Sequence, residues 1–196
     1  MAARLTVQLG HPALKAQNQT IQDFTDPKLS QLLMDLKDTM YKEGLIGIAA
    51  PQIGENYRVF ITEPRETQYR PRDQADEFRV YINPKIVWES NEEIIIWEGC
   101  GSVTETGIFG PVSRAKVVEV EAHDQFGGKF RFKADGILGR VIQHEMDHLL
   151  GTEFIEKVSD YSKLKSLEFY LKEVKDSPDQ KITQKITLKE YQKLGM

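Results

Sequence analysis

Hydrophobic positions recur at helical spacing in two segments that flank a region of strand-like runs. In the first segment, residues 26–44, leucines and a methionine recur every three or four residues between Asp26 and Pro27 at the start and Gly44 at the end. These boundary residues are typical of a helix. The second segment, residues 161–174, carries an apolar stripe at Leu164, Leu167, Leu171 and Val174. We predict one helix for each segment, the second packed through its stripe.

Between these segments, short runs rich in β-branched and aromatic residues are typical of strands. They cover residues 57–62, 79–83, 86–98, 114–124 and a further run that follows the glycine turn at 127–128. In residues 114–124, Val118 and Val120 alternate with charged residues. This alternation predicts antiparallel strands with one face in water.

A third helical segment follows the last strand. Asp135 can cap it, Gly151 can stop it after Leu150, and it is apolar around most of its circumference. A helix that is apolar on all sides is expected to be buried. The pattern therefore predicts an α+β fold, with antiparallel β-strands packed around this central helix and with an N-terminal and a C-terminal helix.

Composition places these elements in one globular domain. The chain has 196 residues, 40% of them hydrophobic and 29% charged, which is enough for one core. We expect residues 1–175 to form a single domain and the polar residues 176–196 to form a partly disordered tail. Residues 63–78 are dense in charge and are predicted to be a solvated surface loop.

The overall charge and the single cysteine narrow the class of protein. A formal net charge of −4 argues against a general nucleic-acid binder, and no apolar run is long enough to cross a bilayer. The N-terminus lacks a secretory signal, and one cysteine cannot form an internal disulfide. We therefore expect a protein of the reducing cytosol.

The candidate chemistry lies on the buried helix, in QHEMDHLLG at residues 143–151. His144 and His148 stand one turn apart on one face and can bind one metal ion, and Glu145 beside them can act as a general base. On a surface helix, solvated side chains would be the ordinary interpretation. On an apolar helix, these groups and Asp147 would be costly to bury without partners, which favours a metal site.

The residues alone leave the third ligand open. The extended zinc-protease pattern HExxHxxGxxH fits as far as Gly151 but has Phe154 in place of the last histidine. A downstream carboxylate, Glu168 or Glu173, could serve, although neither belongs to a supporting motif. The other candidates are His11, His123 and the lone Cys100, which by itself would be interpreted as a small core thiol.

Three motifs, taken in order, resemble those of the peptide deformylase family. They are GIAAPQIG (47–54), WEGCGSV (97–103) and QHEMDHLLG (143–151), against the family's GφGφAAxQ, EGCLS and QHExDHLxG, with φ apolar. LGHPALK near the start is similar to the family's GxPxL opening. The resemblance implies a hydrolase that removes the N-formyl group from formyl-methionine at the N-terminus of nascent polypeptides and releases formate.

The resemblance also implies a metal centre. One divalent ion would be bound by Cys100, His144 and His148, with the fourth position open to water. The family usually carries Fe²⁺, and Zn²⁺, Ni²⁺ or Co²⁺ can occupy the same ligands. Asp147 and Arg114 match a pair that braces the metal helix.

In the implied mechanism, Glu145 takes a proton from the metal-bound water, the hydroxide attacks the formyl carbonyl, and Glu145 returns the proton to the leaving amine. The side-chain amide of Gln52 and the backbone N–H of Gly101 would bind the oxyanion. The resemblance also implies which positions line the methionine pocket or hold the peptide: Ile46, Gly47, Ile96, Glu98, Gly99, Ile137, Arg140 and Val141. For the isoleucines in this set, packing in the core is the alternative role.

Three positions depart from the family pattern. Gly101 replaces the leucine of EGCLS, which is expected to open space beside the metal. Leu45 replaces the first glycine of GφGφAAxQ, and Phe109 stands where an arginine often grips the peptide. We expect an active enzyme with altered peptide preference or inhibitor fit, because every implied ligand and the base are present.

Two other functions remain open at this point. An HExxH endopeptidase would use Glu168 or Glu173 as its third ligand. A non-enzymatic module would bind through its C-terminal helix and tail, for example at the ribosome near the exit tunnel, although a purely structural metal site has no need of Glu145. The expected partners are formyl-methionyl nascent peptides, with no membrane and no specific nucleic acid.

Overall fold

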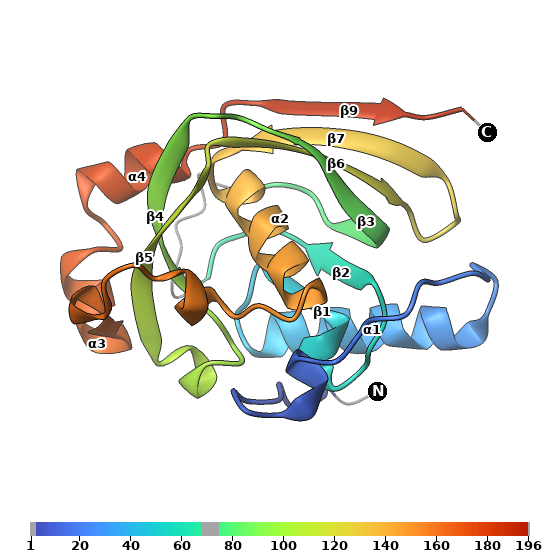
Figure 1. Cartoon of the computed structure of the whole chain (residues 1–196), viewed down its shortest axis with the longest axis horizontal. Coiled ribbons are helices and arrows are strands. Elements are labelled where there is room, and N and C mark those ends of the chain that lie inside the picture. The colour runs from blue at the N-terminus through green and yellow to red at the C-terminus, as the bar shows by residue number, and fades with distance from the viewer. Residues whose placement is uncertain (1–2, 68–74, 196) are drawn as a thin grey trace.

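The computed structural model describes residues 3–67 and 75–195 and shows two sheets around one central helix (Figure 1). The strands are β1 (Gly47–Ala49), β2 (Val59–Thr62), β3 (Arg79–Glu89), β4 (Glu93–Gly99), β5 (Ile108–Ala115), β6 (Val117–His123), β7 (Lys129–Asp135), β8 (Lys165–Ser166) and β9 (Lys189–Lys193). The α-helices are α1 (Pro27–Lys42), α2 (Gly136–Leu149), α3 (Leu167–Glu173) and α4 (Pro178–Gln184). One sheet has the order β1-β2-β3-β6-β7-β9 and the other β4-β5-β8, with antiparallel pairing throughout. The predicted α+β architecture is confirmed.

Helix α2 occupies the centre of the molecule, between the two sheets (Figure 1). Every residue of it except His144 is buried. Leu138, Ile142 and Met146 pack in the same cluster as Phe60 of β2 and strands β6 and β7. The prediction of a buried helix is confirmed, and polar groups on such a helix need partners inside the protein.

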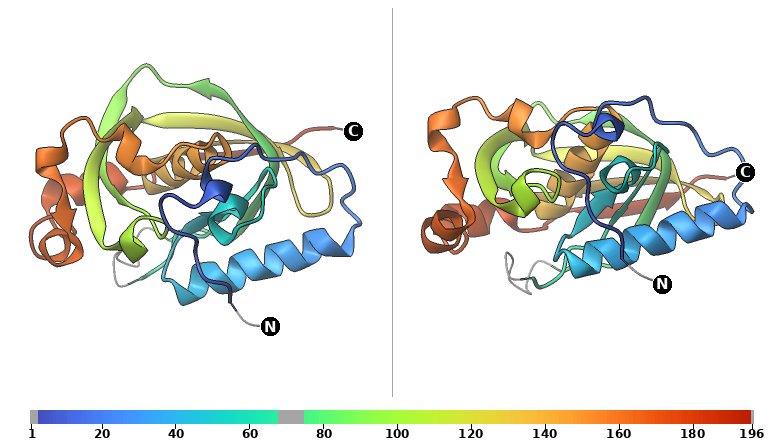
Figure 2. Two further views of the ribbon diagram at one scale, coloured as in Figure 1. Left: turned by 60° about the horizontal axis from the view of Figure 1, so that its bottom comes forward. Right: turned by 90° about the horizontal axis from the view of Figure 1, so that it is seen from below.

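Helix α1 covers the other face of the larger sheet (Figure 2). Val59 and Ile61 of β2 pack with Leu36 and Met40 of α1, whereas Phe60 packs toward α2. Because side chains alternate along a strand, β2 has apolar partners on both faces, which explains its unbroken apolar sequence. In β6, and in β7 as far as Ala134, buried residues alternate with partly exposed or exposed ones, so one face is accessible to water, as predicted.

The strand boundaries near residue 84 differ from the prediction. The runs 79–83 and 86–98 were expected to be separate strands, but β3 continues through Pro84 to Glu89. Asn83 takes a positive φ of 51° and the register with β6 shifts between Ile82 and Lys85, so the proline is accommodated in a bulge. The chain then turns at residues 90–92 and returns as β4.

The helix predicted over residues 161–174 is shorter than expected. Residues 161–163 form a 3₁₀ turn, β8 pairs with Ile108 and Phe109 of β5, and α3 begins only at Leu167. Pairing with β5 overrides the helical spacing at the start of this segment. Leu171 of the predicted stripe is 37% exposed, and Tyr170 is buried in its place.

The C-terminal residues are not the partly disordered tail that their polarity suggested. They form α4 and then β9, which pairs along β7 as an edge strand of the larger sheet. Asp135 does not cap α2 with its side chain; its carboxylate accepts hydrogen bonds from the Thr187 N–H at 2.7 Å and the Leu188 N–H at 2.8 Å. Gln180 and Gln184 of α4 are also buried. These polar contacts order the segment and place it beside the start of α2.

The charged residues 63–78 are anchored in part. Residues 68–74 of this predicted surface loop lie outside the described residues. Arg65 donates to the carbonyl oxygens of Met40, at 3.1 Å, and of Leu45. Asp76 is paired with Lys189 of β9. The ends of the segment therefore bind the body of the protein and are not simply solvated.

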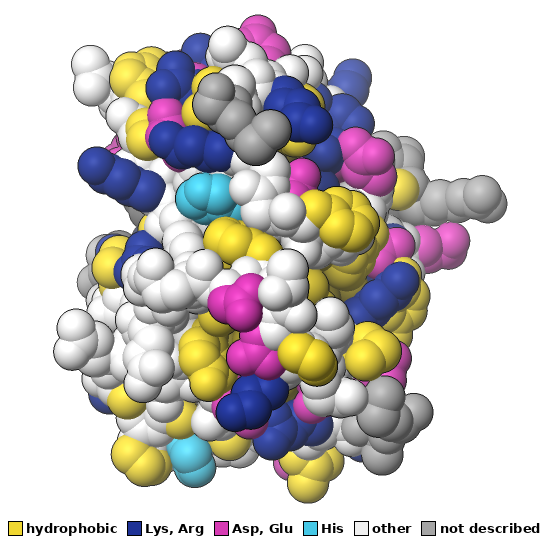
Figure 3. All heavy atoms as spheres, turned by 90° about the vertical axis from the view of Figure 1, so that its right-hand side faces the viewer, with side chains coloured by type: hydrophobic (Ala, Val, Ile, Leu, Met, Phe, Trp, Pro, Cys, Tyr) yellow, Lys and Arg dark blue, Asp and Glu magenta, His cyan; other side chains and the backbone are white. Residues whose placement is uncertain are grey.

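The surface mixes charge and apolar groups. On the face shown in Figure 3, hydrophobic side chains are interspersed with basic and acidic ones. Among the helices described, none is long and apolar enough to span a membrane.

Replacing Gly136 by alanine should detach the C-terminal segment. Gly136 has a φ of +56°, and a Cβ there would lie 2.2 Å from the Lys185 carbonyl oxygen. Gly10 is a matched control because its φ is also positive, at +95°, but a Cβ there would meet no atom within 4 Å. Both variants should be destabilised by the roughly 1–2 kcal/mol of strain that a side chain adds at a positive φ, and Gly136→Ala should lose about 1–3 kcal/mol more stability through its clash with Lys185. Urea unfolding gives the free energy of unfolding of each variant. Equal losses in the two variants would show that the C-terminal segment does not pack against Gly136.

Candidate metal centre and active site

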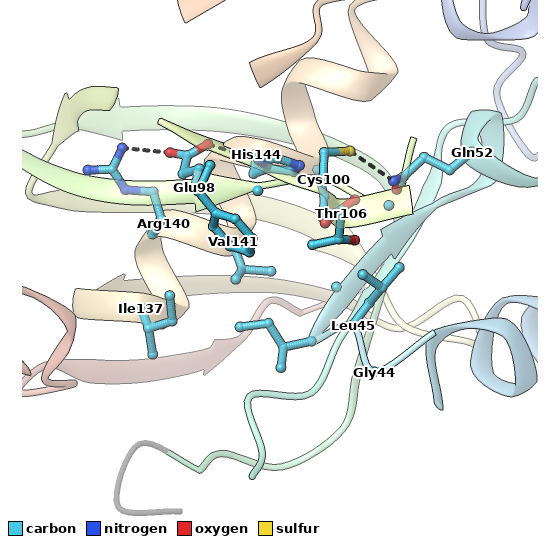
Figure 4. Close-up of a pocket in the computed structure, with 16 residues that line it drawn as sticks. Gly44, Leu45, Gln52, Glu98, Cys100, Thr106, Ile137, Arg140, Val141 and His144 are labelled. Atoms are coloured by element: carbon cyan, nitrogen blue, oxygen red, sulfur yellow. Dashed lines mark hydrogen bonds and ion pairs between the residues drawn. The ribbon is translucent and has the colours of Figure 1, made fainter. Parts of the chain in front are cut away.

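Three side chains with metal-binding atoms converge beside α2. His144 and His148 lie one turn apart on this helix, with ring centroids separated by 5.0 Å. Cys100 follows β4 directly, and its Sγ is 3.2 Å from Nε2 of His148. One ligand atom from each of the three residues lies within 4.8 Å of the others. The three predicted ligands are therefore brought together, and Figure 4 shows two of them, Cys100 and His144.

The donor set fits a divalent transition metal. One thiol and two imidazoles are ligands that zinc, iron, cobalt and nickel accept, and three protein donors leave a coordination position for a reacting molecule. Cys100 is 2% exposed, and burial raises the pKa of its thiol. A bound cation would reverse this preference, because thiolate is the ligand form.

Glu98 on β4 contacts the Nδ1 side of the His144 ring. Its Oε2 lies 2.9 Å from Nδ1 of His144, and its two oxygens accept hydrogen bonds from Arg114 at 2.7 and 2.9 Å and from Arg140 at 2.8 Å. Burial alone would raise the pKa of Glu98, but Arg114, His144 and Arg140 hold it well below its usual range. Arg114 also pairs with Asp147, so the predicted bracing pair is in contact.

Arg140 lines the cavity and is held by hydrogen bonds inside the protein. Its guanidinium donates to Glu98 and to the carbonyl oxygens of Val112, at 3.0 Å, and Ile94, at 2.7 Å. The residue is 3% exposed. It therefore braces Glu98 and β4.

Glu145 faces the same cavity as the histidine beside it. It is 3% exposed, and its Oε2 has no hydrogen-bond partner within the described part of the chain. A Cβ on Gly47 would lie 2.7 Å from Oε1 of Glu145 and 2.4 Å from Val141. A side chain at position 47 would therefore clash with Glu145, and glycine leaves room for its carboxylate. Burial raises the pKa of the Glu145 carboxyl, which makes it a stronger base than a surface glutamate.

Gln52 is oriented by the backbone of its own turn. The Ala49 N–H donates to Oε1 of Gln52 at 2.8 Å, which turns Nε2 toward Cys100 Sγ, 3.5 Å away. The Ser102 N–H also points at this sulfur, at 3.4 Å. An amide donor is therefore held next to the metal ligands, as expected for Gln52.

A cavity of about 580 Å³, including its open mouth, leads to these groups (Figure 4). Ile96 of β4 is fully buried and is not among the residues that line it. Thr106 and Gly44 line the cavity but were not among the predicted residues. The implied pocket positions that do line it are Ile46, Gly47, Glu98, Gly99, Ile137, Arg140 and Val141.

Comparisons with known proteins agree with this geometry. The family model described as polypeptide deformylase matches residues 4–164. The chain belongs to the polypeptide deformylase family. Among curated deformylases, it is 39% identical to peptide deformylase 2 of Nostoc sp. over 78% of this chain and 84% of that protein, and 38% identical to the Carboxydothermus hydrogenoformans enzyme over 82% and 96%.

Solved deformylase structures share the fold. A class I type b peptide deformylase from Acinetobacter baumannii superposes with a TM-score of 0.75 at 32% identity, covering 81% of this chain and all of that one. The Synechococcus elongatus deformylase in complex with actinonin gives 0.72 at 33% identity, covering 81% and 82%. The chain is therefore an enzyme of the deformylase type.

Two departures from the deformylase motifs compensate each other. Gly101 does not open space beside the metal ligands, because Leu45 fills it: a Cβ on Gly101 would lie 3.0 Å from Cδ1 of Leu45. Leu45 of the first motif thus takes the place of the leucine that the second motif, EGCLS, would have at position 101. Both residues line the cavity.

The third departure, Phe109, is part of the core. It is 2% exposed and stacks on Tyr170 with ring centroids 3.9 Å apart. A Cβ on Gly99 would lie 2.7 Å from this ring. Phe109 therefore supports the cavity wall and does not reach out to a peptide.

The other candidate ligands lie elsewhere. Glu168 is exposed on α3, and Glu173 pairs with Lys165. His11 accepts a hydrogen bond from the Ala13 N–H at 3.2 Å, and His123 packs on Phe24. Within residues 3–67 and 75–195, the cluster suited to a metal is Cys100, His144 and His148.

Exchanging the two compensating residues should show strong coupling. Gly101→Leu alone should cost about 1–3 kcal/mol by overpacking against Leu45, and Leu45→Gly alone leaves a gap. The double variant should recover at least about 1 kcal/mol relative to the sum of the two losses. Urea unfolding of all four proteins gives this value, and strictly additive losses would show that the side chains do not share the space.

Proposed function

We propose that the chain is a metal-dependent hydrolase that removes the formyl group from N-terminal formyl-methionine of nascent peptides and releases formate. The observation that carries the proposal is the cluster of Cys100, His144 and His148 beside a cavity that Cys100, His144 and Glu145 line. Membership of the family supports the reaction, and the geometry supports the residue roles.

One divalent ion would be held by Cys100 Sγ and by the imidazoles of His144 and His148. Bound there, it would supply Lewis acidity, which polarises a carbonyl and lowers the pKa of a water molecule. Resemblance to the family favours Fe²⁺, and Zn²⁺, Ni²⁺ or Co²⁺ suit the same donors. Glu98, locked by Arg114 and Arg140, keeps His144 in place for this role.

Glu145 would move the proton in both halves of the reaction. Its carboxylate accepts the proton of the attacking water and then donates it to the amine that leaves when the C–N bond breaks. The unpartnered Oε2 is available for this transfer. The pKa of the carboxyl, raised by burial, suits a group that must hold a proton and then release it.

Gln52 and Gly101 would stabilise the oxyanion that forms on the formyl oxygen. The Gln52 amide is fixed by Ala49, so its Nε2 donor needs no reorganisation during the reaction. The carbonyl oxygen of Gly101 accepts from Gln8 at 2.9 Å, which anchors the segment that carries the backbone donor. We assign the oxyanion to these two donors and the metal together.

An apolar wall would select the methionine side chain. Ile46, Ile137 and Val141 form one buried cluster that borders the cavity. Such a wall suits an unbranched, flexible methionine. A structure of the Acinetobacter deformylase has Met-Ala-Ser bound, at 32% identity and a TM-score of 0.73 to this chain. We propose that a formyl-methionyl peptide lies in the same way here.

Formate release tests the proposal. Protein prepared without oxygen and loaded with Ni²⁺ or Fe²⁺ is incubated with formyl-Met-Ala-Ser, and formate and peptide products are measured. We expect formate together with intact Met-Ala-Ser, and much slower release from formyl-Asp-Ala-Ser, because an acidic side chain cannot be buried on the apolar wall. Cleavage between amino acids would support an endopeptidase, and no formate from fully loaded protein would defeat the proposal.

We also propose that the enzyme works in the bacterial cytosol, near the ribosome exit tunnel where formylated chains emerge. The chemistry of the ligand set supports the first point, because a metal-binding thiol must stay reduced. The second rests on the proposed substrate alone.

A further inference from the structure

A second buried carboxylate faces the metal ligands. Glu153 follows the end of α2 and is 0% exposed. Among the residues described, neither of its carboxylate oxygens receives a hydrogen bond. Its Oε2 lies 3.6 Å from Nδ1 of His148, which is itself buried. A carboxylate buried in this way is costly unless a cation offsets its charge.

The surroundings hold Glu153 in this position. Its backbone N–H donates to Oε1 of Glu156 at 2.8 Å, which fixes the turn after α2. Phe154 next to it is buried in the cluster that contains Cys100. The side chain is therefore directed by a well-packed turn toward the metal ligands.

The two histidines have matching surroundings. His144 has its Nδ1 2.9 Å from Glu98, within hydrogen-bond distance, whereas Nδ1 of His148 faces Glu153 at 3.6 Å and, like both oxygens of Glu153, has no hydrogen-bond partner among the described residues; Nε2 of His148 faces Cys100. A carboxylate on Nδ1 keeps the proton there and leaves Nε2 unprotonated for a metal. Each imidazole thus has a carboxylate behind it.

The two carboxylates differ in charge balance. Glu98 is neutralised by Arg114 and Arg140. For Glu153, the ion pair found within the described residues is with His148 alone. Glu153 therefore places an acidic side chain on the Nδ1 side of His148, and no lysine or arginine of the described residues pairs with it.

We propose that Glu153 is a positioning residue that orients His148 for metal binding. This inference rests on the proposed metal centre. It predicts that loss of this carboxylate lowers the affinity for metal, because the imidazole of His148 is then no longer held in one orientation.

The test compares Glu153→Gln with the matched control Glu156→Gln, which keeps the acceptor for the turn and changes an exposed carboxylate. Apo protein is titrated with Co²⁺ against a competing chelator, and its absorption spectrum and thermal unfolding are recorded. We expect Glu153→Gln to bind Co²⁺ at least tenfold more weakly, as for other partners of metal-binding histidines. Its cobalt spectrum should shift, and the thermal unfolding of the apo protein shows whether the variant is folded. Glu156→Gln should bind Co²⁺ as the unmodified protein does.

The outcomes separate the two proposals. If Glu153→Gln loses less than tenfold in Co²⁺ affinity while the unmodified protein binds normally, the role of Glu153 is wrong and the metal centre stands. If the unmodified protein takes up no Co²⁺, both are wrong. Should the glutamine variant not fold, Glu153→Leu provides the same comparison, because an apolar side chain suits the neighbourhood of Phe154.

Discussion

Replacing Glu145 by glutamine should reduce kcat/KM for formyl-Met-Ala-Ser by about 10²–10⁴-fold, the usual contribution of a general acid–base group. The amide has the same shape but cannot accept the proton of the attacking water. Because Glu145 is not one of the three clustered ligands, the variant should keep the metal content of the unmodified protein. Formate release and metal per chain are measured on the same anaerobic sample.

Glu145→Asp provides the control for this prediction. It keeps the carboxylate but draws it back by one methylene group, so part of the activity should remain. A glutamine variant with its metal bound and its full rate would contradict the role of Glu145, even if the protein is a deformylase. A glutamine variant without metal would show that Glu145 belongs to the metal site.

Replacing Glu98 by glutamine should destabilise the fold by about 3–5 kcal/mol at neutral pH, as expected when one partner of a buried ion pair is removed. The change leaves Arg114 and Arg140 without their shared counter-charge inside the protein. Glu121→Gln is a control, because Glu121 also pairs with two cations, Lys129 and Arg131, but at the surface. In urea unfolding, Glu121→Gln should lose clearly less free energy of unfolding than Glu98→Gln.

The same ion pairs predict how stability depends on pH. Because the pKa of Glu98 in the folded protein is well below its usual value, its contribution is complete above the unfolded pKa of about 4.3 and is lost as the pH falls toward the folded pKa. The free energy of unfolding should therefore decrease below about pH 4.3, and less steeply in Glu98→Gln. If the free energy of unfolding falls equally steeply with pH in the unmodified protein and in Glu98→Gln, the pKa of Glu98 is not lowered in the folded protein.

The central helix and its chemistry could be predicted because they depend on local spacing. His144 and His148 are one turn apart in any helix, and the apolar positions around them indicate burial. Cys100 is far from them in the sequence, and only the resemblance to a family assigned it to the same site. The structure then places its sulfur within 3.2 Å of His148.

Features that depend on distant contacts could not be predicted. Asp135 has the local signature of a helix cap, but its carboxylate is bound by the backbone of residues 187–188, and this contact orders the polar C-terminus. Leu45 and Gly101 looked like two independent departures, and only their proximity shows that one replaces the other. Glu153 carried one sequence signal, a charged residue between the helix-stopping Gly151 and the buried Phe154, which alone does not indicate a partner.

The metal content of protein purified without oxygen tests the account most directly. One divalent ion per chain is predicted for the unmodified protein, and Cys100→Ala should lose it, because the thiolate is one of three protein ligands. Glu168→Gln, which changes an exposed carboxylate on α3, should keep it. Full metal occupancy in Cys100→Ala, or its loss in Glu168→Gln, would contradict a centre built from Cys100, His144 and His148.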